Sequence, residues 1–132
     1  MTRRAARTHA FTLIFQLPFR PDFDRLAIDD YLLEEKAEGD GRTFIIEVVC
    51  GTLESLAKID SLIDERLKDW DLARISRIDL ALLRLATYEI RYSNDVSAAT
   101  AINEAVELAK IYGTDDSPSF INGLLGKVVQ DG

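Results

Sequence analysis

The sequence has 132 residues and a mass of 14.8 kDa, which is the size of one ordinary domain. Hydrophobic residues make up 47% and charged residues 30%, a balance that excludes a disordered chain and an integral membrane protein. The single cysteine, Cys50, can form neither an internal disulfide nor a thiolate metal cluster, which favours a cytoplasmic protein. Seven glycines and three prolines are also few for an all-β sandwich or barrel.

The charge is distributed unevenly along the chain. The net charge is −7, yet residues 1–21 contain four arginines and no acidic residue. Residues 22–132 therefore hold 12 of the 16 basic residues and all 23 acidic ones. An acidic chain is unlike a general nucleic-acid binder, so the basic N-terminal arm is the first feature that suggests a function.

The arm raises the question of a targeting signal. The apolar stretch at 10–17 is interrupted by Thr12 and Gln16, and no small-x-small cleavage site follows it, so we expect no signal peptide. An organellar transit peptide has a similar arginine-rich, acid-poor composition and stays an alternative. No run approaches the roughly 18–20 apolar residues that span a bilayer, so we expect no membrane segment.

The first half of the chain shows a helical period in its apolar residues. Residues 3–17 form one apolar stripe, with Thr2 as a candidate N-cap and Pro18 ending the helix. Residues 24–37 predict a second helix, closed by a turn that begins at Gly39.

A longer helical pattern follows, over residues 43–69. It exceeds most globular helices in length, so we expect a kink or break near Gly51 or Ser61. A short helical turn is predicted at 71–75.

The next helix begins with a capping-box variant. Ser76 is the predicted N-cap of a helix that runs to Tyr92, and Asp79 stands where its carboxylate can reach back to the cap. Asp79 and Glu89 both fall within the apolar arc of this helix. Glu89 has no local partner, so a buried ion pair or the N–H groups of a neighbouring helix must satisfy it.

Two further helices complete the chain. Residues 98–112 form an alanine-rich stripe closed by Gly113, and Ser117 with the following proline predicts an N-cap and first helical residue. Gly123 and Gly126 lie inside the last helix, where close helix packing is favoured over a ligand. The sequence therefore predicts an all-α fold of six or seven helices, forming one domain over residues 1–132.

Signals of catalysis or metal binding are absent. His9 is the single histidine, so a metal site or a cysteine–histidine pair would have to be built from isolated residues. Residues 39–41 lack the pattern of a phosphate-binding loop, and the acidic residues at 22–30 do not match an EF-hand. We expect no enzyme, no cofactor and no metal.

The arginine cluster is the strongest functional signal from the residues alone. In a helix, Arg3, Arg4 and Arg7 share one face, where their charges repel and oppose the helix dipole. Phosphates of RNA or DNA, or carboxylates of a partner, would compensate for this arrangement, and arginine suits forked hydrogen bonds to phosphate. The alternatives are that the arginines are simply solvated, or that acidic residues of the same chain neutralise them.

Several stretches of the sequence resemble one known family. The arm RRAAR at 3–7 is followed by Ala10 and the aromatic Phe15. The later stretches are ISRIDLALLRLATYEI at 75–90, TAINEAVELAK at 100–110 and DSPSFINGLL at 116–125. Together they resemble the NusB family of bacterial transcription antitermination factors, specifically over 72–129 and less so over 3–17.

The resemblance implies an all-α fold of two small bundles packed across each other, and a protein that is not an enzyme. Such proteins bind the single-stranded boxA element of nascent RNA together with NusE, a small-subunit ribosomal protein. With other Nus factors they act on the RNA polymerase elongation complex and suppress termination, notably in ribosomal RNA operons. By position, the resemblance places Arg4 and Arg7 against RNA, with Phe120 and Asn122 beside them, and the charge argument adds Arg3.

The resemblance also places Phe15 and Asp79 at the NusE surface, which gives Asp79 a second interpretation beside capping. Two alternatives stay open. The same helical module could be the RNA-binding portion of a ribosomal RNA cytosine methyltransferase. The chain could instead be a structural adaptor, a helical homodimer whose arginines lie in its own interface.

Overall fold

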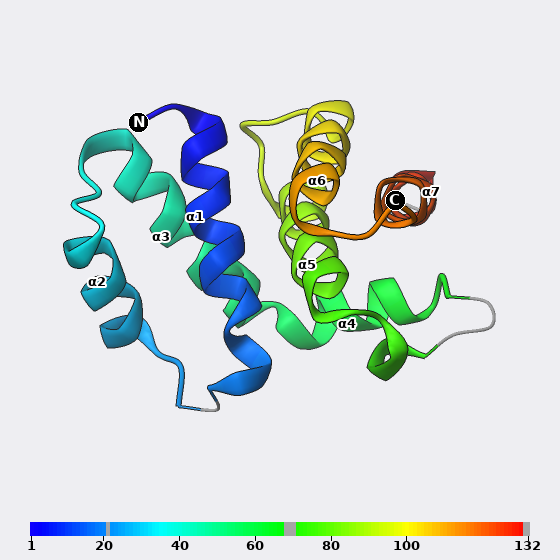
Figure 1. Ribbon diagram of the computed structural model, residues 1–132, viewed down its shortest axis with the longest axis horizontal. Coiled ribbons are helices and arrows are strands. Elements are labelled where there is room, and N and C mark those ends of the chain that lie inside the picture. Colours follow the sequence, from blue (N-terminus) through cyan, green and yellow to red (C-terminus); the bar gives the residue numbers. More distant parts are fainter. Residues whose placement is uncertain (21, 68–70, 131–132) are drawn as a thin grey trace.

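The computed structural model describes residues 1–20, 22–67 and 71–130, and this part of the chain contains α-helices and two 3-10 turns but no strand (Figure 1). The helices are α1 Arg3–Phe15, α2 Arg25–Glu34, α3 Gly39–Glu54, α4 Leu56–Asp64, α5 Arg77–Tyr92, α6 Ala98–Tyr112 and α7 Ser117–Gln130. The 3-10 turns are η1 Leu17–Phe19 and η2 Leu72–Arg74. The all-α prediction is confirmed, including the short turn after residue 71.

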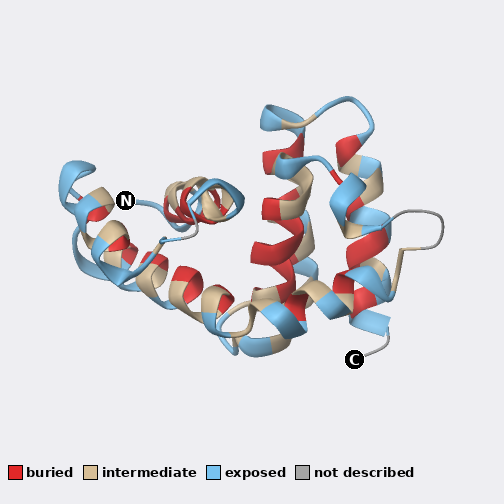
Figure 2. Cartoon of the chain, turned by 90° about the horizontal axis from the view of Figure 1, so that it is seen from below, coloured by how far each residue is buried: buried red, intermediate tan, exposed pale blue. Residues whose placement is uncertain are grey.

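Helix α5 is the centre of the fold. Helices α1, α2 and α3 form one small bundle and α4 to α7 form the other, and α5 packs against members of both (Figure 1). Residues 81–87 of α5 are all buried, as expected of a helix enclosed on every side. Buried residues line the facing sides of the helices in both bundles (Figure 2), and one apolar cluster connects them. The predicted arrangement of two packed bundles is confirmed.

Short side chains cap the start of two helices as the sequence predicts. The hydroxyl of Thr2 accepts a hydrogen bond from the N–H of Ala5, and that of Ser76 accepts one from the N–H of Asp79. Helix α1 ends two residues before the predicted limit, because the chain tightens into η1 around Pro18.

The predicted turn at Gly39 is wrong. Helix α2 ends in a Schellman turn whose left-handed residue is Lys36, with φ of 57°. The N–H of Ala37 reaches the carbonyl of Leu32 at 2.9 Å and closes this turn. Gly39, with φ of 61°, instead opens α3, so residues 39–41 are the first turn of a helix.

The long helical pattern breaks at Ser55, between α3 and α4, rather than at Gly51 or Ser61. The last residues of that pattern, 68–69, lie outside the described part of the chain. Gly51 does not break the helix. It lies against the ring of Tyr88 on α5, where a Cβ would collide with that ring. This glycine lets α3 and α5 approach closely.

Two expectations about α7 are also wrong. Ser117 is already helical, and its hydroxyl accepts a hydrogen bond from the N–H of Thr114 at 3.0 Å, so it secures the turn before the helix. Gly123 and Gly126 do not mark close packing, since a Cβ at either position would meet no atom within 4 Å.

We therefore expect Gly123→Ala to raise the free energy of unfolding by about 0.5–1 kcal/mol, because alanine fits an open helical site and restricts the unfolded chain. The measurement is a thermal melt. Gly39→Ala is the matched control, because Gly39 is equally open but has a positive φ, so alanine should destabilise there. A melting temperature that falls in both variants would contradict this account of α7.

No helix in the described ranges combines the length and apolarity needed to cross a membrane.

Candidate RNA and partner surfaces

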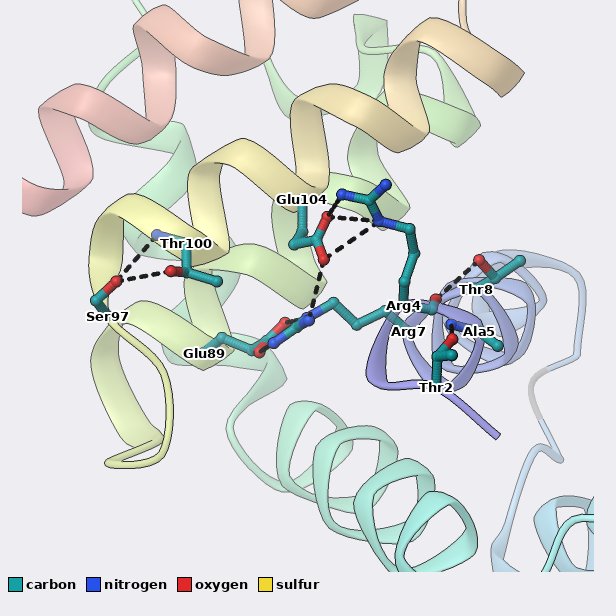
Figure 3. Close-up of polar contacts among 9 residues, drawn as sticks. All are labelled: Thr2, Arg4, Ala5, Arg7, Thr8, Glu89, Ser97, Thr100 and Glu104. Carbon is teal, nitrogen blue, oxygen red and sulfur yellow. Dashed lines mark hydrogen bonds and ion pairs between the residues drawn. The ribbon is translucent and has the colours of Figure 1, made fainter.

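The three arginines of the arm are separated by the structure. Arg3, Arg4 and Arg7 all start from the first two turns of α1, but their main contacts differ. Figure 3 shows Arg4 beside Glu104, and Arg7 between Glu89 and Glu104. The guanidinium of Arg3 lies over the ring of Phe44 on α3, with 4.4 Å from Cζ to the ring centroid. Arg4 reaches α6 and Arg7 reaches α5.

Arg4 is the exposed member of the arm that carries an ion pair. Its Nη2 and Nε donate to one carboxylate oxygen of Glu104, at 2.8 and 3.1 Å. The side chain of Arg4 remains 64% exposed, whereas that of Glu104 is 13% exposed. The hydrogen bond to Glu104 raises the pKa of the Arg4 guanidinium above its ordinary value, so Arg4 is charged at any physiological pH.

Arg7 is buried and forms a forked ion pair with Glu89. Its Nε lies 2.9 Å from Oε1 of Glu89, and its Nη2 lies 2.9 Å from Oε2. The two side chains are 6% and 2% exposed. Glu104 completes the group, with Oε1 at 3.5 Å from Nη1 of Arg7. A buried ion pair is thus the partner that the sequence required for Glu89, and it ties α1 to α5.

The acidic residues of the same chain therefore neutralise much of the arm, which was one of the alternatives open from the sequence. Arg7 faces the interior, so its guanidinium reaches a phosphate only if its pair with Glu89 opens. Arg3 and Arg4 are the arginines that solvent reaches in the first turn of α1.

Phe15 lies within an aromatic row on one side of α1. Its ring centroid is 6.3 Å from that of Phe11 and 5.6 Å from that of Phe19. Phe19 is 49% exposed and carries the guanidinium of Arg77 over its ring, at 4.2 Å. Phe15 is half-buried, so part of an apolar ring row faces solvent near the start of α5.

Asp79 is held only in part by the predicted cap. Its N–H donates to Ser76 at 3.1 Å, but its Oδ1 is buried and finds no hydrogen-bond partner in the described part of the chain. Asp79 lines a pocket of about 270 Å³ together with Arg74, Asp116 and Phe120. The predicted cap therefore leaves one carboxylate oxygen of Asp79 without a hydrogen bond.

Contrary to what the resemblance implied, Phe120 does not lie beside Arg7. It shares the pocket of Asp79 at the start of α5, whereas Arg7 contacts Glu89, ten residues further along that helix. Ten helical residues correspond to about 15 Å. Asn122 is exposed one turn into α7. The candidate residues thus form two groups at different ends of α5.

The sequence model of the NusB family matches residues 4–130. The chain belongs to this family. It is 45% identical to the transcription antitermination protein NusB of Acetivibrio thermocellus, over 98% of this chain and 90% of that protein. Identity to the protein of the same name from Alkaliphilus oremlandii is 41%, over 98% and 94% of the two chains.

Solved structures of NusB have the same fold. The structure of T. maritima NusB has a TM-score of 0.89 and 36% identity, covering 99% of this chain and 92% of that one. A structure described as antitermination factors NusB and NusE in complex with dsRNA also has a TM-score of 0.89, over 98% and 97% of the chains. Its identity of 21% makes this a likeness of fold.

Sequence reasoning missed two residues that contact the arginines of α1. Phe44 supports Arg3, but its place in an amphipathic helix looks like ordinary packing. Glu104 lies within the stretch that resembled the family, yet no role followed from it. Its contact with Arg4 joins residues 100 positions apart, which local patterns do not reveal.

Proposed function

We propose that this protein is an RNA-binding transcription antitermination factor of the cytoplasm. It binds boxA-type RNA together with a ribosomal protein of the NusE type, and it acts with other Nus factors on the RNA polymerase elongation complex, notably in ribosomal RNA operons. The observation that carries this proposal is the pair of exposed arginines, Arg3 and Arg4, at the N-terminus of α1 in a NusB-family fold. Because the rest of the chain is acidic, Arg3 and Arg4 offer the most favourable place for RNA phosphates to bind.

The second group of residues suits the bases rather than the phosphates. Phe120 offers a half-buried ring on which a base can stack, and Asn122 offers an exposed amide that can pair with a base edge. Since the two groups lie at different ends of α5, an extended single strand would connect them. We propose that RNA passes from Arg3 and Arg4 to Phe120 and Asn122, with Arg7 fixing the position of the arm from the interior.

The partner surface lies at the start of α5. The aromatic row that includes Phe15 supplies apolar surface area. Asp79 supplies a carboxylate oxygen, Oδ1, that accepts no hydrogen bond within the described part of the chain. Lys or Arg of a ribosomal protein could provide a donor. Because Asp79 and Phe120 share a pocket, a partner bound there would also meet the RNA, which supports joint binding.

Both alternatives from the sequence have less support. The curated relatives are named for antitermination rather than for methyl transfer. An adaptor whose arginines lie in a homodimer interface would need Arg7 at the surface, but Arg7 is buried within the chain.

A titration tests the proposal. Fluorescent boxA RNA and an RNA of permuted sequence are each titrated with the protein, with and without NusE. We expect boxA RNA to bind more tightly than the permuted RNA, and NusE to increase the difference. Equal binding of both RNAs, with NusE present, would contradict the proposal.

We expect Arg4→Ala to weaken boxA binding and to reduce the slope of log affinity against log salt by about 0.7, the value for one phosphate contact on a single strand. The measurement is the same titration at several salt concentrations. Arg25→Ala is the matched control, because Arg25 is also an exposed helical arginine with one ion pair, but it lies on α2. An unchanged slope in the Arg4 variant would remove this residue from the RNA site.

A further inference from the structure

The contact between Arg4 and Glu104 has a consequence for RNA binding. Arg4 donates through Nε and Nη2, the edge of the guanidinium that also forks around a phosphate. A carboxylate and a phosphate oxygen therefore use the same donors. In the unbound protein, the N–H groups of Arg4 that would donate to an RNA phosphate already donate to the carboxylate of Glu104.

The geometry allows this contact to be exchanged. Arg4 is largely exposed and Glu104 is largely buried, so the guanidinium can turn outward while the carboxylate stays in place between α1 and α6. Glu104 would not be left as an unpaired charge, because its Oε1 lies 3.5 Å from Nη1 of Arg7. Arg7 in turn is fixed by Glu89 and cannot follow Arg4 outward.

We infer that Glu104 sets the RNA affinity of the arm by competing with an RNA phosphate for Arg4. When RNA binds, the forked contact of Arg4 moves from Glu104 to the phosphate, and Glu104 keeps Arg7 as its cationic partner. The inference rests on the proposed function, since it requires that Arg4 contacts RNA. It assigns an acidic residue of α6 the role of lowering affinity at a basic site.

Glu104→Gln tests this competition, because glutamine keeps the shape of the side chain and removes its charge. We expect boxA RNA to bind about two- to fivefold more tightly, the range that corresponds to losing one exposed ion pair. The gain should shrink at high salt, which screens the competing ion pair. In an Arg4→Ala background, the same substitution should leave RNA affinity unchanged.

Two variants separate competition from a general effect of charge. Glu107→Gln removes the same charge one turn along α6, where the carboxylate pairs with Lys110 at 3.1 Å, so it should change affinity less. Glu104→Asp keeps the net charge and shortens the side chain by one methylene, so the contact with Arg4 should weaken and affinity should still rise. A thermal melt of each variant shows that the fold is retained.

The outcomes distinguish this inference from the proposed function. If Arg4→Ala weakens RNA binding but Glu104→Gln and Glu104→Asp do not tighten it, Glu104 supports the arm and the inference is overturned. If Glu107→Gln tightens binding as much as Glu104→Gln, the effect is one of overall charge and the inference is also overturned. If Arg4→Ala leaves RNA binding unchanged, the proposed role of the arm fails, and the inference fails with it.

Discussion

Arg7→Ala is expected to lower the free energy of unfolding by about 3–5 kcal/mol, because it leaves the carboxylate of Glu89 buried without its forked partner. Glu89 lies in the central helix and is 2% exposed, so water cannot replace the guanidinium without opening the contact between α1 and α5. For a chain of this length, the melting temperature should fall by roughly 10 °C or more. Thermal melts and urea titrations measure both quantities.

Two controls show whether the buried pair is responsible. Arg4→Ala removes an arginine from the same network at an exposed position, so it should leave the melting temperature within a few degrees of the parent. The double variant Arg7→Met with Glu89→Leu replaces the pair by apolar side chains of similar volume and should recover most of the stability. If Arg7→Ala melts like the parent protein, the pair does not hold the two bundles together.

This expected loss of stability affects how arginine variants of the arm are interpreted. A protein that lacks Arg7 can lose RNA affinity because α1 is no longer positioned against α5. Arg4→Ala avoids this ambiguity, since Arg4 contributes its charge at the surface. The salt slope of Arg4→Ala is therefore the cleaner test of phosphate contact.

The parts of the fold that follow local rules could be predicted from the sequence. Helix α5 begins after Ser76 and ends at Tyr92 as expected, because capping and apolar periodicity depend on residues within a few positions of each other. The end of α2 could not be predicted in this way. Its left-handed residue is Lys36, a type that rarely adopts that conformation, so the glycine at 39 was the more plausible but wrong signal.

The candidate site was predictable in its residue types but not in its pairings. An arginine cluster at a helix N-terminus requires compensation, and a carboxylate in the apolar arc of α5 requires a partner. The structure joins these two requirements in one contact, between residues 82 positions apart in the chain. Which arginine would be buried depends on how α1 crosses α5, and that crossing is set by tertiary packing rather than by the arm itself.

Asp79→Asn is expected to reduce the affinity for NusE by roughly tenfold or more while leaving the melting temperature nearly unchanged. Asparagine keeps the shape of the side chain but removes the charge that a cationic donor of the partner would require. Little stability should be lost, because the hydroxyl of Ser76 still caps α5 through the N–H of residue 79. Removing a charge from the first turn costs a few tenths of a kcal/mol, and the buried atom at the place of Oδ1 then belongs to a neutral group, which is less costly to bury than a charged one.

Isothermal titration of NusE into the parent and the variant, beside a thermal melt, measures both effects. Asp40→Asn is the matched control, because Asp40 is an exposed carboxylate in the first turn of α3, on the other bundle. It removes the same charge from the first turn of a helix, so NusE affinity should not change there. RNA binding without NusE should also be unaffected by Asp79→Asn. Equal NusE affinities together with a clear loss of stability would show that Asp79 acts on the start of α5 alone, and the partner surface would then have to lie elsewhere.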